Sequence, residues 1–361
     1  MAVLVPVSPE SPGERFRTQC RNCGLPPVLD FDRLLLRAPE GRTRRKIEDR
    51  LGALVTDLRY DPRTEELMIA DLPHRAVAEA LKAACHSTEL LDVMVVPLAG
   101  SAAQLDDFRR MMRGSDYVAM VHGQWLIQFI EEGGLTNHVQ PIVDAAGSVY
   151  GHEFLARGTD ADGSPVPAFR MIEAASTPRL AAYFDRSARL EAVASAARLG
   201  PDGAIFINFL PSTVYDPKSC LKTTVAAVQA AGIAPERVVF EVVETEQITD
   251  LSHLRAIMDF YRDAGFRIAL DDFGAGFNNL AHFIALDPDF IKIDKAITQA
   301  VVTSSLARNV VETLVQNAHA ADVTVIAEGV EDADMWAQLQ ALGCDLFQGY
   351  HLGRPGPLPE A

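Results

Sequence analysis

The sequence predicts an α/β fold in which a small α+β module precedes a (β/α)8 barrel. From about Thr136 onward, short apolar runs rich in β-branched residues alternate with longer amphipathic segments, which is the pattern of repeated β/α units. Eight such runs occur before the chain ends, and their spacing matches the size of a (β/α)8 barrel. Only Asp144 to Ser148 separates the first two runs, which is too short for a crossover helix. We therefore predict that the first strand is antiparallel, unlike that of an ideal barrel.

The predicted strands and helices of the barrel follow this alternation in order. The strands are His138 to Val143, Val149 to Leu155, Ala204 to Phe209, Val238 to Val243, Arg267 to Asp271, Phe290 to Ile293, Thr324 to Ala327 and Leu346 to Tyr350. The helices are Tyr183 to Ala197, Thr223 to Ala231, Gln247 to Asp263, Ser305 to Ala321 and Asp332 to Leu342. Gly232, Gly265 and Gly343 end three of them, as glycine often does at a helix C-terminus.

The N-terminal third has a different pattern, which predicts a small α+β module. Leu54 to Tyr60 and Glu66 to Ala70 are predicted strands around an Asp61-Pro62 turn, Ala76 to Cys85 is a predicted helix, and Leu90 to Pro97 is a further predicted strand. Ala102 to Glu132 is predicted to be a helical connector. We expect a regulatory or scaffolding module over residues 1–122 and the barrel over residues 123–361.

Composition limits the classes of partner. The chain has 361 residues, 48% hydrophobic and 23% charged, which suits one large core and a smaller unit. A formal net charge of -16 argues against a general binder of nucleic-acid polymers or acidic membranes, because such proteins carry basic surfaces. An anionic substrate would need local help from a metal ion or an arginine.

The sequence also predicts a cytoplasmic protein with reduced thiols. No apolar run reaches the length of a membrane helix, and Met1 to Val7 lacks the features of a signal peptide. The five cysteines are scattered, which fits free thiols better than a disulfide framework. Cys20 and Cys23 form a lone Cys-x-x-Cys that could hold Zn²⁺ if Cys85-His86 completed the site, with structural thiols as the default interpretation.

The paired carboxylates Asp271-Asp272 carry the strongest chemical signal. They stand at the end of an apolar run and directly before Phe273-Gly274-Ala275-Gly276. Two adjacent acids where a buried strand meets a glycine-rich turn are costly to place unless cations neutralise them. The pair therefore indicates half of a divalent-metal site.

Further polar residues stand at the ends of the other predicted strands. In a parallel barrel such strand ends converge on one pocket. The set contains carboxylates and one amide, which favour Mg²⁺ or Mn²⁺ over zinc. Two ions sharing a carboxylate would clamp a phosphodiester and activate a water for in-line attack. The residues are Glu153, Asn208, Glu241, Asp271, Asp272, Lys292, Glu328 and Gln348.

Simpler interpretations fit less well. An isolated Asp-Asp is most often a turn or a helix cap, but its place at a strand end with six polar partners favours a site. Asp272-Phe273-Gly274 also occurs in protein kinases, yet no glycine-rich nucleotide loop or His-Arg-Asp catalytic loop accompanies it here.

Seven motifs in order resemble the EAL-domain family of cyclic di-GMP phosphodiesterases. They are EFLAR at Glu153, the asparagine strand at Asn208, FEVVE at Phe240, DDFGAGF at Asp271, IKID at Ile291, AEGVE at Ala327 and QGY at Gln348. The resemblance extends from about Thr136 to Pro357. It implies a (β/α)8 barrel with an antiparallel first strand.

The resemblance also implies a role for each matching residue. Metal ligands would be Glu153, Asn208, Glu241 and Asp271, with Asp271 bridging to a second ion also held by Asp272. Lys292 would contact the attacking water, and Glu328 and Gln348 would complete the surroundings of the second ion. Catalytic roles would fall to Lys292, Glu328 and Glu153, and substrate contacts to Arg157, Gln348 and Glu331.

Glu244 resembles the glutamate that steadies the glycine-rich loop, here Phe273 to Phe283, which shapes the metal site and the dimer interface in the family. This chain departs from the family pattern at Phe154, Val243 and Asn278-Asn279. None of these departures removes a ligand, although Val243 and Asn278 change the hydrogen-bonding options of the loop.

Together these observations imply metal-dependent hydrolysis of cyclic di-GMP to linear 5′-pGpG by a protein that forms a homodimer through the barrel. Two alternatives remain at this point. One is a receptor that binds cyclic di-GMP without cleaving it, and the other is a metal phosphodiesterase on the same barrel that prefers another nucleotide. No GGDEF-type cyclase motif is visible.

Overall fold

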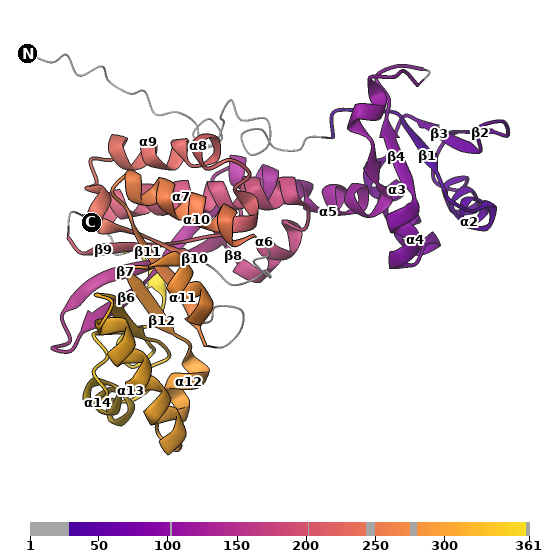
Figure 1. Cartoon of the computed structure of the whole chain (residues 1–361). Helices are drawn as coiled ribbons and strands as arrows, with labels where there is room; N and C mark the ends of the chain where they lie inside the picture. Colours follow the sequence, from indigo (N-terminus) through magenta and orange to yellow (C-terminus); the bar gives the residue numbers. More distant parts are fainter. Residues whose placement is uncertain (1–28, 102, 201, 243–249, 275–279, 359–361) are drawn as a thin grey trace, which may run out of the picture. The chain divides into compact units, whose positions relative to one another are not determined.

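The computed structural model describes residues 29–101, 103–200, 202–242, 250–274 and 280–358. These residues form two units (Figure 1). One unit contains Phe129–Ala168 and the chain from Ala182 onward, and it is the barrel. The other contains Pro26–Gln128 together with Phe169–Ala181. The predicted boundary between residues 122 and 123 falls inside a continuous helix, α5 (Gly114–Glu131).

Eight strands close the barrel. In order of pairing they are β6 (Leu135–Asp144), β7 (Val149–Thr159), β9 (Ala204–Phe209), β10 (Val238–Val242), β11 (Arg267–Phe273), β12 (Phe290–Ile293), β13 (Thr324–Ala327) and β14 (Leu346–Phe347), which pairs back with β6. Two short strands, β8 (Pro165–Val166) and β15 (Gly356–Pro357), pair with β7 and β6. The TIM-like barrel that the sequence predicts is thereby confirmed.

Strand β6 runs antiparallel to both of its barrel neighbours, β7 and β14, whereas the pairs from β7 to β14 are parallel. The turn between β6 and β7 explains this direction. Asp144 accepts hydrogen bonds from the amides of Ala146 and Ser148 through its carboxylate, and Gly147 supplies a left-handed φ of 81°. The chain therefore reverses within a few residues.

Helices lie around the outside of these strands (Figure 1). They are α7 (Pro178–Leu199), α8 (Pro217–Cys220), α9 (Lys222–Ala230), α10 (Leu251–Asp263), α11 (Leu280–Leu286), α12 (Lys295–Ala300), α13 (Ser305–His319) and α14 (Ala333–Ala341), with 3-10 turns at Pro211–Thr213 and Pro235–Arg237. Asp250, Ser304 and Asp332 cap the N-termini of α10, α13 and α14 through side-chain oxygens. The three glycines expected after helices all have positive φ.

The second unit is built on a five-stranded sheet in the order β2-β3-β1-β4-β5. Its strands are β1 (Leu34–Arg37), β2 (Asp57–Asp61), β3 (Glu66–Ala70), β4 (Met94–Pro97) and β5 (Met112–Arg113). Its helices are α2 (Gly41–Leu51), α3 (His74–Ala84), α4 (Ser87–Asp92), α5 and α6 (Ala168–Ala174), with a 3-10 turn at Asp107–Arg110. Buried Leu34, Leu36, Ile69, Val77 and Leu81 belong to its core.

Two predictions for this unit were wrong in part. The strand predicted from Leu90 begins only at Met94, because the preceding residues form α4. The Glu89 side chain accepts a hydrogen bond from the amide of His86 and so starts a helix that hydrophobicity alone does not reveal. The predicted helical connector begins only at Gly114, after the 3-10 turn and β5.

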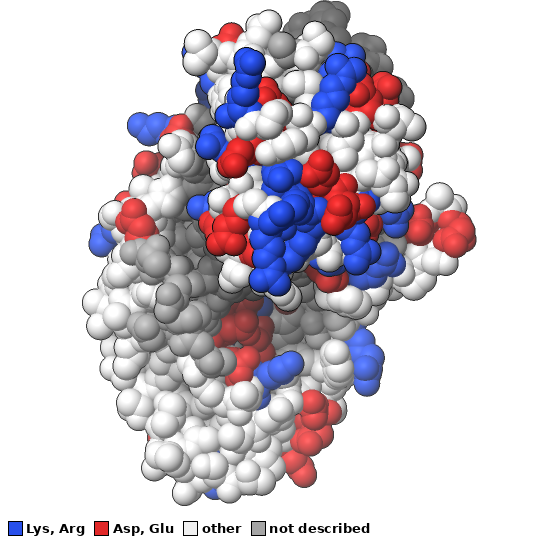
Figure 2. Space-filling view, turned by 90° about the vertical axis from the view of Figure 1, so that its right-hand side faces the viewer, with Lys and Arg blue, Asp and Glu red and all other residues white. Residues whose placement is uncertain are grey.

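Within the described parts of the chain, no helix combines the length and the apolar character needed to cross a bilayer. On the face drawn in Figure 2, Lys and Arg side chains are interspersed with Asp and Glu. The basic side chains on that face therefore have acidic side chains next to them, which weakens their attraction for a nucleic-acid polymer.

Candidate active site

The barrel interior is layered, and the layers explain where the polar residues come from. Ile142, Ala204, Phe206, Val239, Ala269, Phe290, Ile326 and Leu346 form one apolar cluster. Side chains two positions apart on a strand share a face, so the residues two positions beyond Phe206, Val239 and Ala269 also point inward. Those residues are Asn208, Glu241 and Asp271. The same step gives Lys292 on β12, and Glu328 and Gln348 directly after β13 and β14.

The antiparallel strand obeys the same rule in reverse. Because β6 runs in the opposite direction, the residue above Ile142 lies two positions earlier in the sequence and is Gln140. Gln140 is buried, and its amide nitrogen donates to the backbone oxygen of Gly353. The sequence pattern does not predict Gln140, because the predicted site residues stand at the C-terminal ends of the second to eighth strands only.

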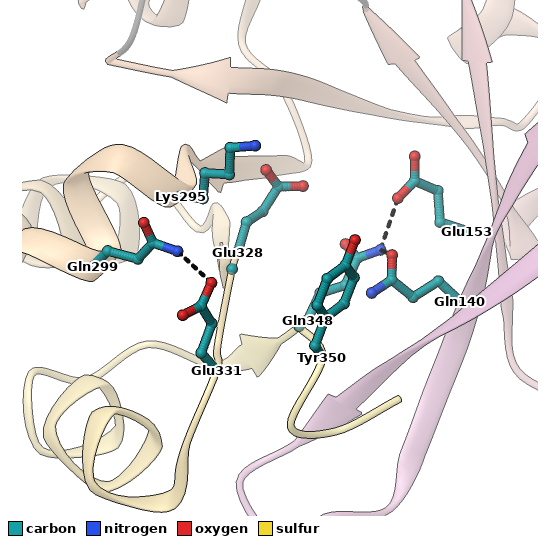
Figure 3. A pocket seen from close by; sticks show the side chains of 10 residues that line it. Gln140, Glu153, Lys295, Gln299, Glu328, Glu331, Gln348 and Tyr350 are labelled. Carbon is teal, nitrogen blue, oxygen red and sulfur yellow. Dashed lines mark hydrogen bonds between the residues drawn. The ribbon is translucent and has the colours of Figure 1, made fainter. Parts of the chain in front are cut away.

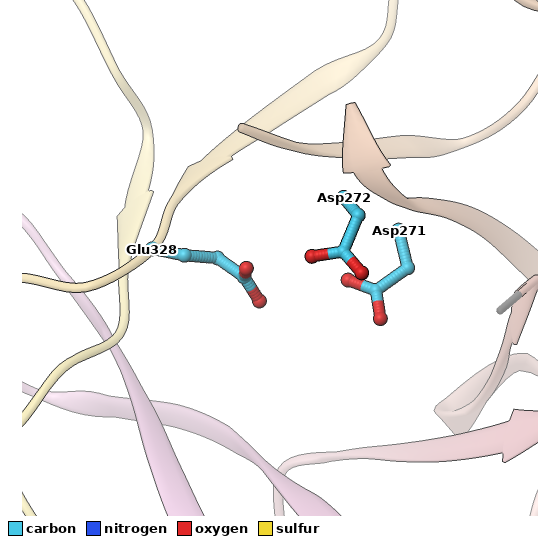
Figure 4. A group of neighbouring side chains, drawn as sticks. All are labelled: Asp271, Asp272 and Glu328. Carbon is cyan, nitrogen blue, oxygen red and sulfur yellow. The ribbon is translucent and has the colours of Figure 1, made fainter. Parts of the chain in front are cut away.

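A bulge in β11 allows Asp271 and Asp272 to serve the same site. Adjacent residues on a regular strand face opposite sides, but here the pairing with β12 shifts by one residue between Leu270 and Phe273. Asp272 adopts a left-handed φ of 50°, which is uncommon for residues other than glycine. Carboxylate oxygens of Asp271, Asp272 and Glu328 consequently lie within 4.8 Å of one another (Figure 4).

Lys292 lies among four carboxylates. Its Nζ atom is 2.7 Å from Glu328 Oε1, 2.9 Å from Glu241 Oε1 and 3.0 Å from Asp271 Oδ1. The fourth distance, to Glu153 Oε2, is 3.5 Å. Burial on its own lowers the pKa of the Lys292 ammonium, but the carboxylates, led by Asp271 and Glu153, outweigh burial and hold this pKa well above its usual value. The ammonium therefore remains charged at the centre of the site.

Two amides orient Glu153. Asn208 Nδ2 donates to Glu153 Oε1 at 2.7 Å, and Gln348 Nε2 donates to Glu153 Oε2 at the same distance (Figure 3). Gln348 Nε2 also lies 3.2 Å from Gln140 Oε1. Burial would raise the pKa of Glu153, but Lys292 and these amides lower it below its ordinary value, so this carboxylate is anionic.

Three other acids of the site have pKa values above their ordinary range. Burial, more than any other cause, raises the pKa of Glu241 well above normal. Burial and the neighbouring Asp271 raise the pKa of Asp272 to about 6. For Glu328, burial and Asp271 outweigh the opposing effect of Lys292 and raise the pKa to about 7. One ammonium does not neutralise this cluster, and the hard oxygen donors fit Mg²⁺ or Mn²⁺.

A pocket of about 350 Å³ opens beside the acids (Figure 3). Glu328 and Glu153 reach it from the acidic cluster around Lys292, and Gln299 Nε2 donates to Glu331 Oε1 at 2.8 Å on its wall. Tyr350 stands at the pocket with the guanidinium carbon of Arg354 4.2 Å from the centre of its ring. The full lining is Gln140, Glu153, Lys295, Gln299, Glu328, Gly329, Glu331, Gln348, Gly349 and Tyr350.

Most of the residues predicted for the site meet in it. Arg157 differs, because its Nη1 atom donates to the neighbouring backbone oxygen of Ala156 and it does not line the pocket. Glu244, Val243 and Asn278-Asn279 lie outside the described residues, as do Cys20 and Cys23. Cys85 is a buried free thiol whose pKa burial raises.

Besides Gln140, the lining residues Lys295, Gln299 and Tyr350 were not predicted from the sequence. Asp294 had no predicted role either, yet it lies close enough to Asp272 to raise the pKa of that carboxylate. Asp294 and Tyr350 could have been found, since they are the last residues of the IKID and QGY motifs. Lys295 and Gln299 belong to α12, a short helix that the strand pattern does not predict.

Some curated proteins similar to this chain are named as phosphodiesterases. The probable cyclic di-GMP phosphodiesterase PdeA of Escherichia coli is 29% identical over 260 residues, which are 71% of this chain and 35% of PdeA. The cyclic di-GMP phosphodiesterase PdeF of the same organism is 27% identical over 67% of this chain and 32% of its own length. The chain thus spans about a third of the length of these relatives.

Solved structures agree with the barrel. A standalone EAL protein from Vibrio cholerae in its c-di-GMP-bound form has a TM-score of 0.58 and 30% identity, covering 63% of this chain and 94% of that one. The family model of the EAL domain matches residues 124–355, which include all eight barrel strands and the entire acidic cluster. The chain therefore belongs to the EAL domain family.

Proposed function

We propose that this chain is a metal-dependent phosphodiesterase that hydrolyses cyclic di-GMP to linear 5′-pGpG. The observation that carries the proposal is the set of buried carboxylates gathered around Lys292 beside a polar pocket. Relatives named cyclic di-GMP phosphodiesterases and a similar EAL protein with c-di-GMP bound support the choice of substrate.

The proposed ligands of divalent ions are Glu153, Asn208, Glu241, Asp271 and Asp272, with Glu328 and Gln348 beside them. Bound ions would supply Lewis acidity to the phosphodiester and lower the pKa of a water molecule. Lys292 already neutralises part of the charge and would orient that water through its ammonium. Substrate contacts are proposed for Arg157, Gln348 and Glu331, of which Arg157 would have to exchange its present bond to Ala156.

We further propose that residues 1–122 regulate or scaffold the barrel and that the barrel forms a homodimer. Support for the homodimer comes from exposed apolar side chains on two helices. Leu280 and Ile284 lie one turn apart on α11, and Leu306 and Val310 lie one turn apart on α13. These helices follow neighbouring barrel strands, β11 and β12.

The function is tested by incubating the full chain with cyclic di-GMP and either Mn²⁺ or Mg²⁺ and separating the products by chromatography. Linear 5′-pGpG is the expected product, and Asp271→Asn or Glu153→Ala should abolish its formation. Asp263→Asn, at an exposed position on α10, is the matched control and should retain turnover.

Three results would overturn parts of the proposal. Undiminished turnover in either active-site variant would remove the assigned site. Recovery of intact but bound cyclic di-GMP from the unaltered chain would identify a receptor. Preferential hydrolysis of a different nucleotide in a competition assay would keep the chemistry and replace the substrate.

A further inference from the structure

A buried polar network lies behind the strands that supply Asn208 and Glu241. Asp185 and Arg189 on α7 form an ion pair with a distance of 3.0 Å from Arg189 Nη2 to Asp185 Oδ2, and both side chains are buried. Arg189 Nη1 also donates to the hydroxyl of Tyr261 on α10 at 3.0 Å, and Tyr261 is fully buried. We call Asp185, Arg189 and Tyr261 the α7–α10 clamp.

One end of the clamp holds the chain directly after Asn208. Asp185 Oδ1 accepts a hydrogen bond from the backbone amide of Leu210 at 2.8 Å, and Asp185 Oδ2 accepts one from Thr213 Oγ1 at 2.8 Å. Thr213 Oγ1 also lies 2.7 Å from the backbone oxygen of Leu210. The strand end is therefore fixed two residues beyond Asn208.

The other end of the clamp holds the residue before Glu241. The Tyr261 ring stacks on Phe240 with centroids 3.9 Å apart and an angle of 13° between the planes. It also meets the ring of Phe209 edge-on at 5.5 Å. Because side chains alternate along a strand, Phe209 and Phe240 point outward while their neighbours Asn208 and Glu241 point into the barrel.

Asn208 and Glu241 are themselves paired across β9 and β10. The clamp therefore contacts two adjacent strand ends from outside the barrel, and the inward side chains of these strand ends belong to the acidic site. A buried ion pair gives little net stability compared with a well-packed apolar substitute. The ion pair instead fixes geometry, because Asp185 accepts a hydrogen bond from one specific backbone amide and Arg189 donates to one specific hydroxyl.

We propose that Asp185, Arg189 and Tyr261 are positioning residues that hold Asn208 and Glu241 in the arrangement that binds a divalent ion. This inference rests on the proposed function, since it assumes that these two side chains are metal ligands. Outer partners that orient metal ligands commonly change metal affinity by about 10- to 100-fold when they are removed.

The test compares two chemically matched substitutions in the full chain. Tyr261→Phe removes a hydroxyl that accepts from Arg189, and Tyr150→Phe removes a hydroxyl that accepts from Arg267 at 2.9 Å. Tyr150 packs against the apolar layer below the acids, away from the strand ends that the clamp grips. Asp185→Asn is a second clamp variant, which removes the charge but keeps an oxygen acceptor.

Mn²⁺ affinity, measured by calorimetry, is the deciding quantity, and thermal unfolding is recorded alongside it. Tyr261→Phe and Asp185→Asn should each raise the dissociation constant for Mn²⁺ by about tenfold or more. Tyr150→Phe should leave that constant within about twofold, even where its melting temperature falls as far as that of Tyr261→Phe. At saturating Mn²⁺ the clamp variants should recover the turnover of the unaltered chain.

Unchanged Mn²⁺ affinity in both clamp variants, in a chain that otherwise binds Mn²⁺, would overturn the positioning role and leave the proposed function intact. Equal loss of affinity in Tyr150→Phe would also overturn it, by showing general loosening of the barrel. A complete lack of Mn²⁺ binding by the unaltered chain would remove both proposals.

Discussion

Asp272 combines a left-handed backbone with a carboxylate that faces Asp271 and Asp294. Asn tolerates the left-handed region about as well as Asp does, so Asp272→Asn removes a charge without a new backbone cost. In EDTA this variant should melt at a higher temperature than the unaltered chain, because the repulsion among the acids falls. Added Mn²⁺ should raise its melting temperature by less, because one anionic ligand is lost.

Differential scanning fluorimetry with EDTA and with Mn²⁺ measures both effects. Asp263→Asn, which removes an exposed charge, should change neither quantity. A lower melting temperature for Asp272→Asn in EDTA would show that the carboxylate stabilises the metal-free chain, contrary to the electrostatic argument.

Lys292 makes the opposite contribution in the same cluster. Its side chain is only 1% exposed and touches Glu241, whose side chain is 0% exposed. Lys292→Met would leave buried carboxylates without their cation, and breaking such a pair costs about 3–5 kcal/mol of unfolding free energy. Urea denaturation in EDTA should show this loss, and Mn²⁺ should restore part of it by replacing the missing positive charge.

Lys295→Met provides the comparison for Lys292→Met, since Lys295 is exposed at the rim of the same pocket. Its unfolding free energy should change by no more than about 0.5 kcal/mol, as is usual for surface substitutions. Similar losses in the two lysine variants would show that burial among the carboxylates is not what makes Lys292 important.

At the scale of elements, the contact between the ends of β13 and β14 depends on a glycine. A β-carbon added at Gly349 would lie 2.1 Å from the backbone oxygen of Val330 and 2.2 Å from its nitrogen. The amide of Val330 also donates to the backbone oxygen of Gln348 at 3.0 Å. The two loops that carry Gln348 and Glu331 therefore approach at main-chain distance.

Gly349→Ala should force these loops apart and lower the unfolding free energy by about 1–3 kcal/mol, the usual cost of overpacking. It should also raise KM for cyclic di-GMP, because the pocket wall moves. Gly356→Ala is the control, since a β-carbon there meets nothing nearer than 3.9 Å. A Gly349→Ala variant as stable and as active as Gly356→Ala would contradict this account.

The barrel strands could be predicted because burial of both faces produces continuous apolar runs in the sequence. Strands such as Ala204–Phe209 and Phe290–Ile293 are buried on both faces, and the predicted bounds match the observed ones. The convergence of Asp271, Lys292 and Glu328 followed from the shared direction of their strands. Gln140 could not be found by the same rule, because β6 presents the opposite end to the site.

The smaller unit was harder to predict, since its elements are short and their signals are local. β1 and α2 received no assignment, although Leu34 and Leu36 lie at the centre of the sheet. The first residues of α4 depend on a hydrogen bond that the amide of His86 donates to the Glu89 carboxylate, which only the folded geometry reveals. The bulge in β11 likewise could not be predicted, because no residue type in the sequence specifies a shift of the strand register.

At the scale of the whole molecule, the proposed homodimer predicts a specific sensitivity to charge. Ile284 is 78% exposed and Leu306 is 71% exposed. The double variant Ile284→Asp and Leu306→Asp should be monomeric by light scattering, because an interface cannot bury unpaired carboxylates cheaply. Val149→Asp, at a comparably exposed position at the start of β7, should leave the mass unchanged. An unaltered chain that is already monomeric would refute the dimer.

The predicted boundary between residues 122 and 123 can be tested by comparing two shortened chains. It divides α5, and Gly123 lies close enough to Leu180 and Ala174 that a β-carbon there would meet both within 3 Å. A chain beginning at Gly123 would lose the first half of this helix, so the residue that packs against Leu180, which is fully buried in the full chain, would become a chain terminus free to fray. Exposing one leucine side chain costs about 1.5–3 kcal/mol.

A chain beginning at Gly114 keeps α5 whole and should unfold at a clearly higher temperature than one beginning at Gly123. Both retain every residue of the acidic cluster, so at saturating Mn²⁺ and low temperature both should hydrolyse cyclic di-GMP at similar rates. Thermal unfolding and product formation, measured on the same two preparations, separate stability from chemistry. Equal melting temperatures would support a division at residue 122, whereas a difference would place α5 with the segment that contains Leu180.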